Sequence, residues 1–149
     1  MAAPRPFDER KQDTLARLAA DNDCWVATAD AEGGAYLVPL SFSFDGSTLL
    51  LATLATNPTG RNMAASGRVR LGIGVTRDVV MVEGTVETLL PADVPVAELE
   101  RFAEHTGFDP RTLKGGWRYF RVTPVTVQAW REANEIPGRD LVVDGTWLG

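Results

Sequence analysis

Apolar and polar residues alternate at every second position through much of the chain, which predicts a succession of β-strands. Residues 35–44 show the pattern most clearly, since Tyr36, Val38, Leu40, Phe42 and Phe44 would share one face of a half-buried strand. The predicted strands cover residues 24–28, 35–44, 48–54, 68–75, 79–88 and 117–131, with a short hairpin over 142–147. Turn residues such as Asp45-Gly46 separate neighbouring segments, so the strands are expected to pair antiparallel.

A helical period replaces the alternation in three places, namely residues 8–21, 57–66 and 91–106. The second helix is the best delimited, because Asn57 is a favoured N-cap, Pro58 suits the first helical position and Gly67 suits the C-cap. The first helix is expected to cover one end of the sheet structure.

Two prolines modify the predicted strands. Pro39 cannot donate to a sheet ladder, so its strand needs a free edge or a local break there. Near Thr123-Pro124 the alternation changes phase, which predicts a β-bulge. About six short antiparallel strands with helices between them indicate a single domain over residues 1–149, mainly β, folded as a Greek-key barrel.

Composition excludes several classes of protein. The net charge is −5 and the 15 basic residues are scattered, so no nucleic-acid partner is expected. No apolar run approaches the roughly 20 residues that cross a bilayer, and the N-terminal residues do not resemble a secretory signal, so we expect a cytoplasmic protein without a membrane partner. The single cysteine, Cys24, excludes an internal disulfide, and no metal site is predicted.

The segment from Thr53 to Asn62 carries the most chemistry. The start of a helix presents unpaired N–H groups that suit a phosphate, and hydroxyls of Thr53, Thr56 and Thr59 are further donors. Gly60 permits close approach, and Arg61 can add bidentate contacts. The alternative is that Asn57 only caps a surface helix and that the Arg61 charge is solvated.

The order of several short motifs resembles a known family. The motifs are Cys24-Trp25-Val26-Ala27-Thr28, Asp30-Ala31-Glu32-Gly33, Val38-Pro39-Leu40, Arg61-Asn62-Met63, and Pro124 with Val127, Gln128 and Trp130. Over roughly residues 15–140 the chain resembles the pyridoxamine 5'-phosphate oxidase-like split-barrel flavoproteins, including their branch that uses a deazaflavin coenzyme.

The resemblance implies a homodimer with FMN or the deazaflavin coenzyme F-420 bound at the subunit interface. The residues expected to border the ring through backbone groups are Val38, Pro39, Leu40 and Ser41. Thr53 and Thr56 are expected near the ribityl-phosphate, with Arg61 and Asn62 on the phosphate. Trp130, with Arg131 or Arg139, is expected to reach in from the partner. The implied function is an oxidoreductase that transfers a hydride to or from a small organic substrate, with no essential protein acid or base.

Departures from the family pattern narrow the expected function. Thr59 stands where many relatives have a lysine, and Gln128 stands where a glutamate is usual. The basic residues that bind the oxidase's own substrate are not evident, so vitamin B6 oxidation is not expected.

Other basic residues and the lone histidine bear on the choice of cofactor. Arg68, Arg70 and Arg77 are candidates for the acidic tail of the deazaflavin coenzyme, and the Arg-rich composition favours that coenzyme over FMN. The alternative function is a non-enzymatic flavin- or haem-binding protein, for which His105, the only histidine, is the candidate axial ligand.

Overall fold

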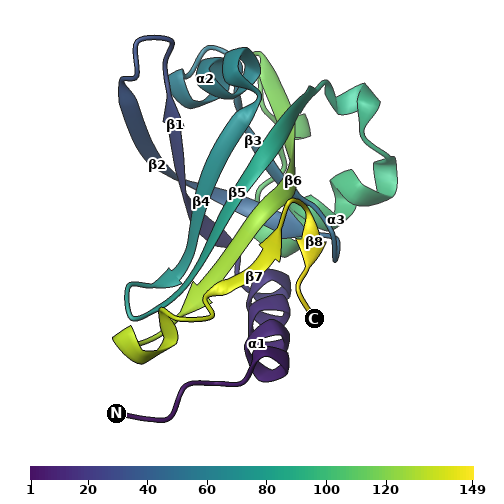
Figure 1. Ribbon diagram of the computed structural model, residues 1–149. Helices are drawn as coiled ribbons and strands as arrows, with labels where there is room; N and C mark the ends of the chain where they lie inside the picture. The colour runs from purple at the N-terminus through teal and green to yellow at the C-terminus, as the bar shows by residue number, and fades with distance from the viewer.

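The computed structural model describes residues 1–149 and contains a closed, six-stranded antiparallel barrel (Figure 1). The strands are β1 (Asp23–Ala29), β2 (Ala35–Phe44), β3 (Leu49–Leu54), β4 (Arg68–Val75), β5 (Asp78–Leu89), β6 (Trp117–Trp130), β7 (Asp140–Val143) and β8 (Thr146–Trp147). Their order is β3-β2-β1-β4-β5-β6, and β6 pairs back onto β3 to close the barrel, while β7 and β8 extend the sheet beyond β6. The predicted mainly-β barrel is confirmed.

Alternation places one face of each strand inside the barrel. Side chains such as Val26, Phe42, Leu71 and Phe120 are fully buried there. Val75 continues the alternation of Leu71 and Ile73 along β4, but its side chain is 65 % exposed. Gly74 just before it has a φ of 92°, which turns the strand and moves Val75 off the inward face.

The bulge predicted in β6 is confirmed. Register against β5 shifts between Glu83 and Gly84, which face Thr126 and Pro124, so that Val125 is the extra residue. Gly84 is needed at this point because a Cβ there would lie 2.6 Å from Cγ1 of Val122. The bulge accommodates the proline and changes which residues of β6 face inward.

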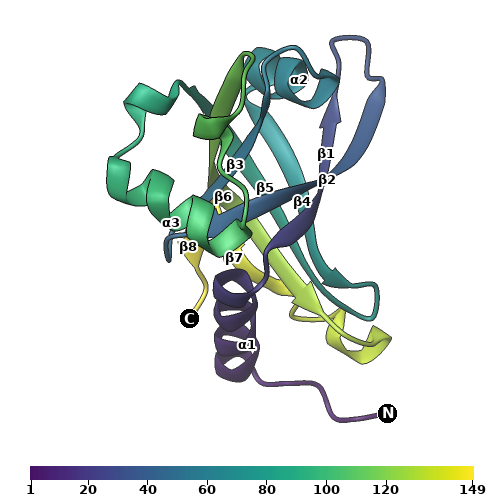
Figure 2. The ribbon, with the colours of Figure 1, turned by 180° about the vertical axis from the view of Figure 1, so that it is seen from behind.

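Helices cover both ends and one side of the barrel (Figures 1 and 2). α1 (Phe7–Ala20) lies beneath one end, as predicted, and contributes Leu18 to the core. α2 (Pro58–Ser66) lies across the other end, and α3 (Val96–Thr106) packs on the outside over β3 and β6. None of these helices has the length and apolar character needed to span a membrane.

The third predicted helix, residues 91–106, was wrong in its first turn. Pro91–Asp93 form a short 3-10 turn, Val94 is extended, and α3 begins only at Val96. Proline disfavours the helical region in the residue before it, which explains the break at Val94-Pro95. Two further 3-10 turns, Pro110–Thr112 and Ala133–Glu135, lie before and after β6.

The segment before α1 is anchored to the turn that follows β6. The guanidinium of Arg5 is buried and donates to both carboxylate oxygens of Glu135, at 2.9 and 2.8 Å. Arg10, also buried, donates to the carbonyl oxygens of Ala129, Glu135 and Gly138. These contacts fix α1 against the end of the barrel.

Candidate functional site

The junction between the end of β3 and the start of α2 brings together the polar side chains predicted to bind a phosphate. Thr53 is buried, and its hydroxyl accepts a hydrogen bond of 3.0 Å from the side-chain amide of Asn57. Asn57 occupies the N-cap position as predicted, but its side chain makes no cap hydrogen bond. The first turn of α2 therefore begins without a side-chain cap on its amides.

Thr59 and Gly60, in that first turn, are both buried. A Cβ on Gly60 would collide with the carbonyl oxygen of Leu54 and lie 3.4 Å from Cγ2 of Thr53. The close approach that this glycine permits is thus to the backbone at the end of β3. Gly60 sets how closely α2 packs on β3.

Arg61 and Asn62 point in different directions. Arg61 is exposed, has no carboxylate partner, and donates from Nη1 to the carbonyl oxygen of Thr56 at 2.8 Å. Asn62 donates from its amide to Oγ1 of Thr28 at 3.1 Å and so ties α2 to β1. Of the two predicted phosphate ligands, Arg61 is free for a ligand and Asn62 already holds the helix in place.

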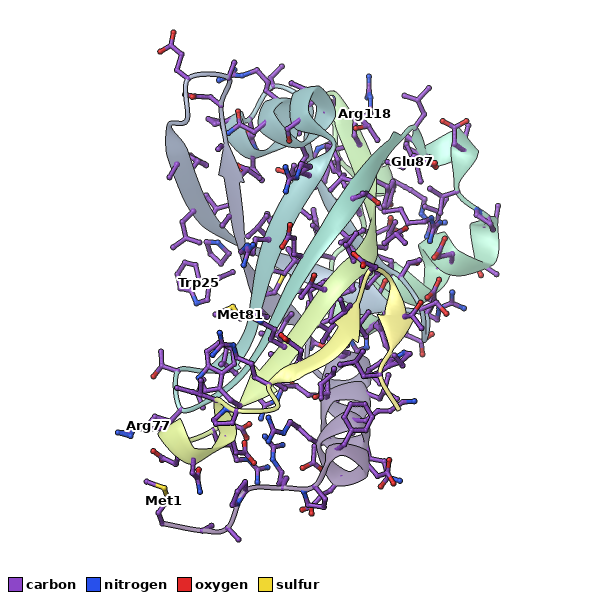
Figure 3. All side chains as sticks on the ribbon, viewed as in Figure 1. Met1, Trp25, Arg77, Met81, Glu87 and Arg118 are labelled. Atoms are coloured by element: carbon purple, nitrogen blue, oxygen red, sulfur yellow. The ribbon has the colours of Figure 1, made fainter.

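A second basic residue, absent from the predicted site, lies at the same place. Arg118, on β6, is directly opposite Thr53 on β3. Figure 3 shows its side chain at the end of the barrel that α2 covers. No sequence motif marks it, because the pairing of residues 53 and 118 exists only once the barrel has closed.

The predicted free edge at Pro39 is confirmed. β3 pairs only with Phe42, Ser43 and Phe44 of β2, so residues 35–41 pair with β1 alone. The amide of Phe42 donates to Asn22 and that of Asp30 to Gly34, so the even-numbered residues of β2 direct their backbone groups toward β1. By the same alternation, the backbone groups of Leu37, Pro39 and Ser41 face the free edge, and those of Val38 and Leu40 lie within the ladder.

Trp130 and Arg131 lie at the opposite end of β6, about 40 Å of strand away from Arg118. Arg131 is engaged by Asp78 at 3.3 Å and Asp13 at 3.6 Å. Within one chain, these two residues are not brought to the phosphate-binding candidates.

Trp130 lines an apolar hollow of about 420 Å³ on the outer face of β1, β4, β5 and β6. Trp25 and Met81 also line it and appear side by side in Figure 3. Trp25 is 53 % exposed and Leu37, at the rim, is 61 % exposed. We refer to Trp25, Leu37, Val75, Met81 and Trp130 as the apolar face.

Arg68 and Arg70, two of the three arginines predicted to bind the acidic tail of the deazaflavin coenzyme, lie close together. Arg68 and Arg70 both pair with Glu83, at 3.2 and 2.8 Å, in a groove of about 430 Å³ that also contains Asp30. Arg77 is elsewhere and pairs with Glu132 at 3.4 Å. The two positive charges of the groove are therefore matched by two carboxylates.

Neither Cys24 nor His105 is free to act as a nucleophile or a general base. Burial raises the pKa of the Cys24 thiol to about 12, so it is not a thiolate near neutral pH. Nε2 of His105 lies 2.9 Å from the carbonyl oxygen of Asp21, a contact that requires the proton on Nε2. In this arrangement His105 joins α3 to the end of α1, and its Nε2 is not available as a haem ligand.

Comparison with known proteins decides the family. The family model described as pyridoxamine 5'-phosphate oxidase matches residues 11–131. The chain belongs to this family. Membership confirms the resemblance seen in the motifs.

Several solved structures of other proteins share this fold. A protein of unknown function from Agrobacterium tumefaciens has a TM-score of 0.68 and 20% identity, with 87% of this chain and 60% of that chain covered. An F420 reductase has a TM-score of 0.63 and 18% identity, with coverage of 75% and 93%. A FAD-binding protein from Mesorhizobium loti has a TM-score of 0.62 and 22% identity, with coverage of 78% and 89%. No protein of curated function matches the sequence significantly.

Features of the β3–α2 junction fit the phosphate of a flavin-type cofactor. Arg61 is exposed and unpaired, the first turn of α2 has no side-chain cap, and the free edge of β2 offers backbone groups to a planar ring. Thr59, the position of the family's usual lysine, is buried and uncharged, so it supplies no cation.

Proposed function

We propose that this protein is an oxidoreductase that binds FMN or the deazaflavin coenzyme F-420 and transfers a hydride to or from a small organic substrate. The observation that carries the proposal is the unpaired Arg61 at the uncapped start of α2, beside Thr53. A guanidinium and free helix amides are together suited to an anion, and the family includes flavin-binding proteins.

The protein's part in this function is binding and orientation. The ring would lie along the free edge of β2, where Leu37 and Ser41 offer an N–H and a carbonyl each and Pro39 offers a carbonyl only. The phosphate would lie at Thr53, Asn57 and Arg61. When bound, the cofactor supplies the hydride chemistry. Cys24 is protonated and Nε2 of His105 is engaged, so neither is expected to act as an acid or base in the proposed reaction.

A second copy of the chain would complete the site. Trp130 is too far along β6 to reach Arg61 of its own chain, and it lies on the exposed apolar face. Burying that face against a second copy is favourable, because exposed aromatic and aliphatic surface is removed from water. The proposed homodimer would bring Trp130 of one protomer toward the ring bound by the other.

The charges of the groove around Arg68 and Arg70 favour FMN over the deazaflavin coenzyme, which has a longer acidic tail. The candidate groove for an acidic tail has Arg68 and Arg70 offset by Glu83 and Asp30, so it offers no excess of positive charge. FMN requires only the phosphate site and the ring edge.

The experiment is a fluorescence titration of the purified protein with FMN and with the deazaflavin coenzyme. We expect FMN to bind, and Arg61→Ala to weaken its binding at least tenfold, because a charge-assisted contact is worth about 1.5 to 3 kcal/mol. Arg101→Ala is the control, since Arg101 is exposed on α3 and has no ion pair.

Unchanged affinity in Arg61→Ala would remove the proposed phosphate site. Stopped-flow oxidation of the reduced cofactor by candidate substrates then separates an enzyme from a binding protein. A protein that holds the cofactor without any substrate-dependent oxidation supports the non-enzymatic alternative.

A further inference from the structure

The geometry points to Arg118 as a second cation of the phosphate site, forming with Arg61 a pair of guanidinium groups around one phosphate. This inference rests on the proposed function and deepens it by assigning a ligand from β6. Arg118 supplies the charge that Thr59 does not provide.

Register and side-chain direction place Arg118 at the site. Residues directly opposite each other on antiparallel strands project to the same face, with Cβ atoms about 5 Å apart. Arg118 is opposite Thr53, and the Thr53 side chain faces the first turn of α2 through its hydrogen bond with Asn57. The side chain of Arg118 is therefore expected on the same side as this turn, and Figure 3 shows Arg118 at the end of the barrel that α2 covers.

The contacts of Arg118 leave most of its guanidinium free. Its hydrogen bond to protein is from Nη1 to the carbonyl oxygen of Trp117, at 2.9 Å. Most arginines of the chain pair with carboxylates, but neither Arg118 nor Arg61 does. Arg118 is half-buried, so a neutralising anion would be held with less screening than on an open surface.

Arg61 and Arg118 lie on different elements, so they would approach a bound phosphate from different directions. Arg61 comes from α2 and folds back onto the loop at Thr56, whereas Arg118 comes from the first residues of β6. A phosphate has several oxygens in different directions and can accept from two guanidinium groups at once. A bare hydroxyl at the end of the ribityl chain cannot engage both in this way.

The test compares FMN with riboflavin, which has the same ring but no phosphate. Arg118→Gln should weaken FMN binding at least tenfold and leave riboflavin binding within twofold of the wild type. Arg118→Lys, which keeps the charge, should recover most of the loss. Arg101→Gln is the matched control and should change neither affinity. Circular dichroism and the melting temperature of each variant monitor folding.

The outcomes separate the two levels of the proposal. If the wild type binds neither FMN nor the deazaflavin coenzyme, the proposed function fails and takes this inference with it. If Arg61→Ala weakens FMN binding but Arg118→Gln does not, the inference alone fails. An equal loss of FMN and riboflavin in Arg118→Gln overturns the inference as well, because Arg118 would then act on the fold and not on the phosphate.

Discussion

At the scale of single residues, the most strongly coupled charges lie away from the candidate site. Glu135 accepts hydrogen bonds from the side chain and the backbone of Arg5 and from the amide of Arg131. The Arg5 guanidinium is the main reason why the pKa of Glu135 falls from its ordinary 4.5 to about 2. These contacts hold the chain before α1 against the turn after β6.

A lowered pKa makes this contact a pH-dependent contribution to stability. The carboxylate of Glu135 stabilises the fold in full above pH 4.5, and the contribution is lost as the pH falls toward 2. We expect Glu135→Gln to lower the free energy of unfolding by about 3 kcal/mol at pH 7. Urea unfolding at a series of pH values should show a smaller loss between pH 4.5 and 2 in the variant than in the wild type.

Glu132→Gln is the control for this prediction. Glu132 pairs only with Arg77, whose side chain is 74 % exposed, and an exposed ion pair contributes about 0 to 1 kcal/mol. Equal destabilisation by the two variants, or none by Glu135→Gln, would contradict a specific role for the buried pair.

At the scale of elements, the packing of α2 on β3 determines where the candidate phosphate ligands lie. Gly60 lies against the backbone of β3 in that contact, and the hydrogen bond from Asn62 to Thr28 ties the helix to β1. Arg61 lies between these two anchors on the chain. Its position therefore depends on backbone packing as well as on its own side chain.

Gly60→Ala tests this packing. In an ordinary helix the change stabilises by up to about 1 kcal/mol. Here the new methyl group would collide with the Leu54 carbonyl, so we expect a net loss of about 1 to 3 kcal/mol in the free energy of unfolding, measured in urea. Gly116→Ala is the control, since its Cβ would lie 4.0 Å from the nearest atoms. Unchanged or increased stability in Gly60→Ala would show that α2 is not packed this closely.

At the scale of the whole molecule, the apolar face is the feature that a single barrel leaves unexplained. Trp25, Leu37 and Val75 are each more than half exposed. Exposed apolar surface of this kind is typical of interaction sites. The proposed occupant is a second copy, which would also bring Trp130 to the ring.

Trp25→Glu tests the proposed homodimer. Trp25 projects outward from β1, so the charge should be tolerated by the monomer but not by a buried interface. We expect the wild type to have the mass of a dimer and the variant that of a monomer, by light scattering after gel filtration, with weaker FMN binding in the variant. Leu113→Glu, at a residue 46 % exposed outside the apolar face, should leave the dimer intact. A monomeric wild type would contradict the prediction.

The sequence alone determined the strands, most helix ends and the local breaks of this protein. Alternation is a property of neighbouring residues, so it located the barrel strands, and Pro39 and Pro124 located the free edge and the bulge through the missing N–H of proline. The tertiary structure decided which distant residues meet. Arg118 faces Thr53, Asn62 holds Thr28 and His105 contacts Asp21 because barrel closure and helix packing set these pairs. No local pattern encodes a contact between strands or helices so far apart along the chain, because its geometry exists only after the whole barrel has formed.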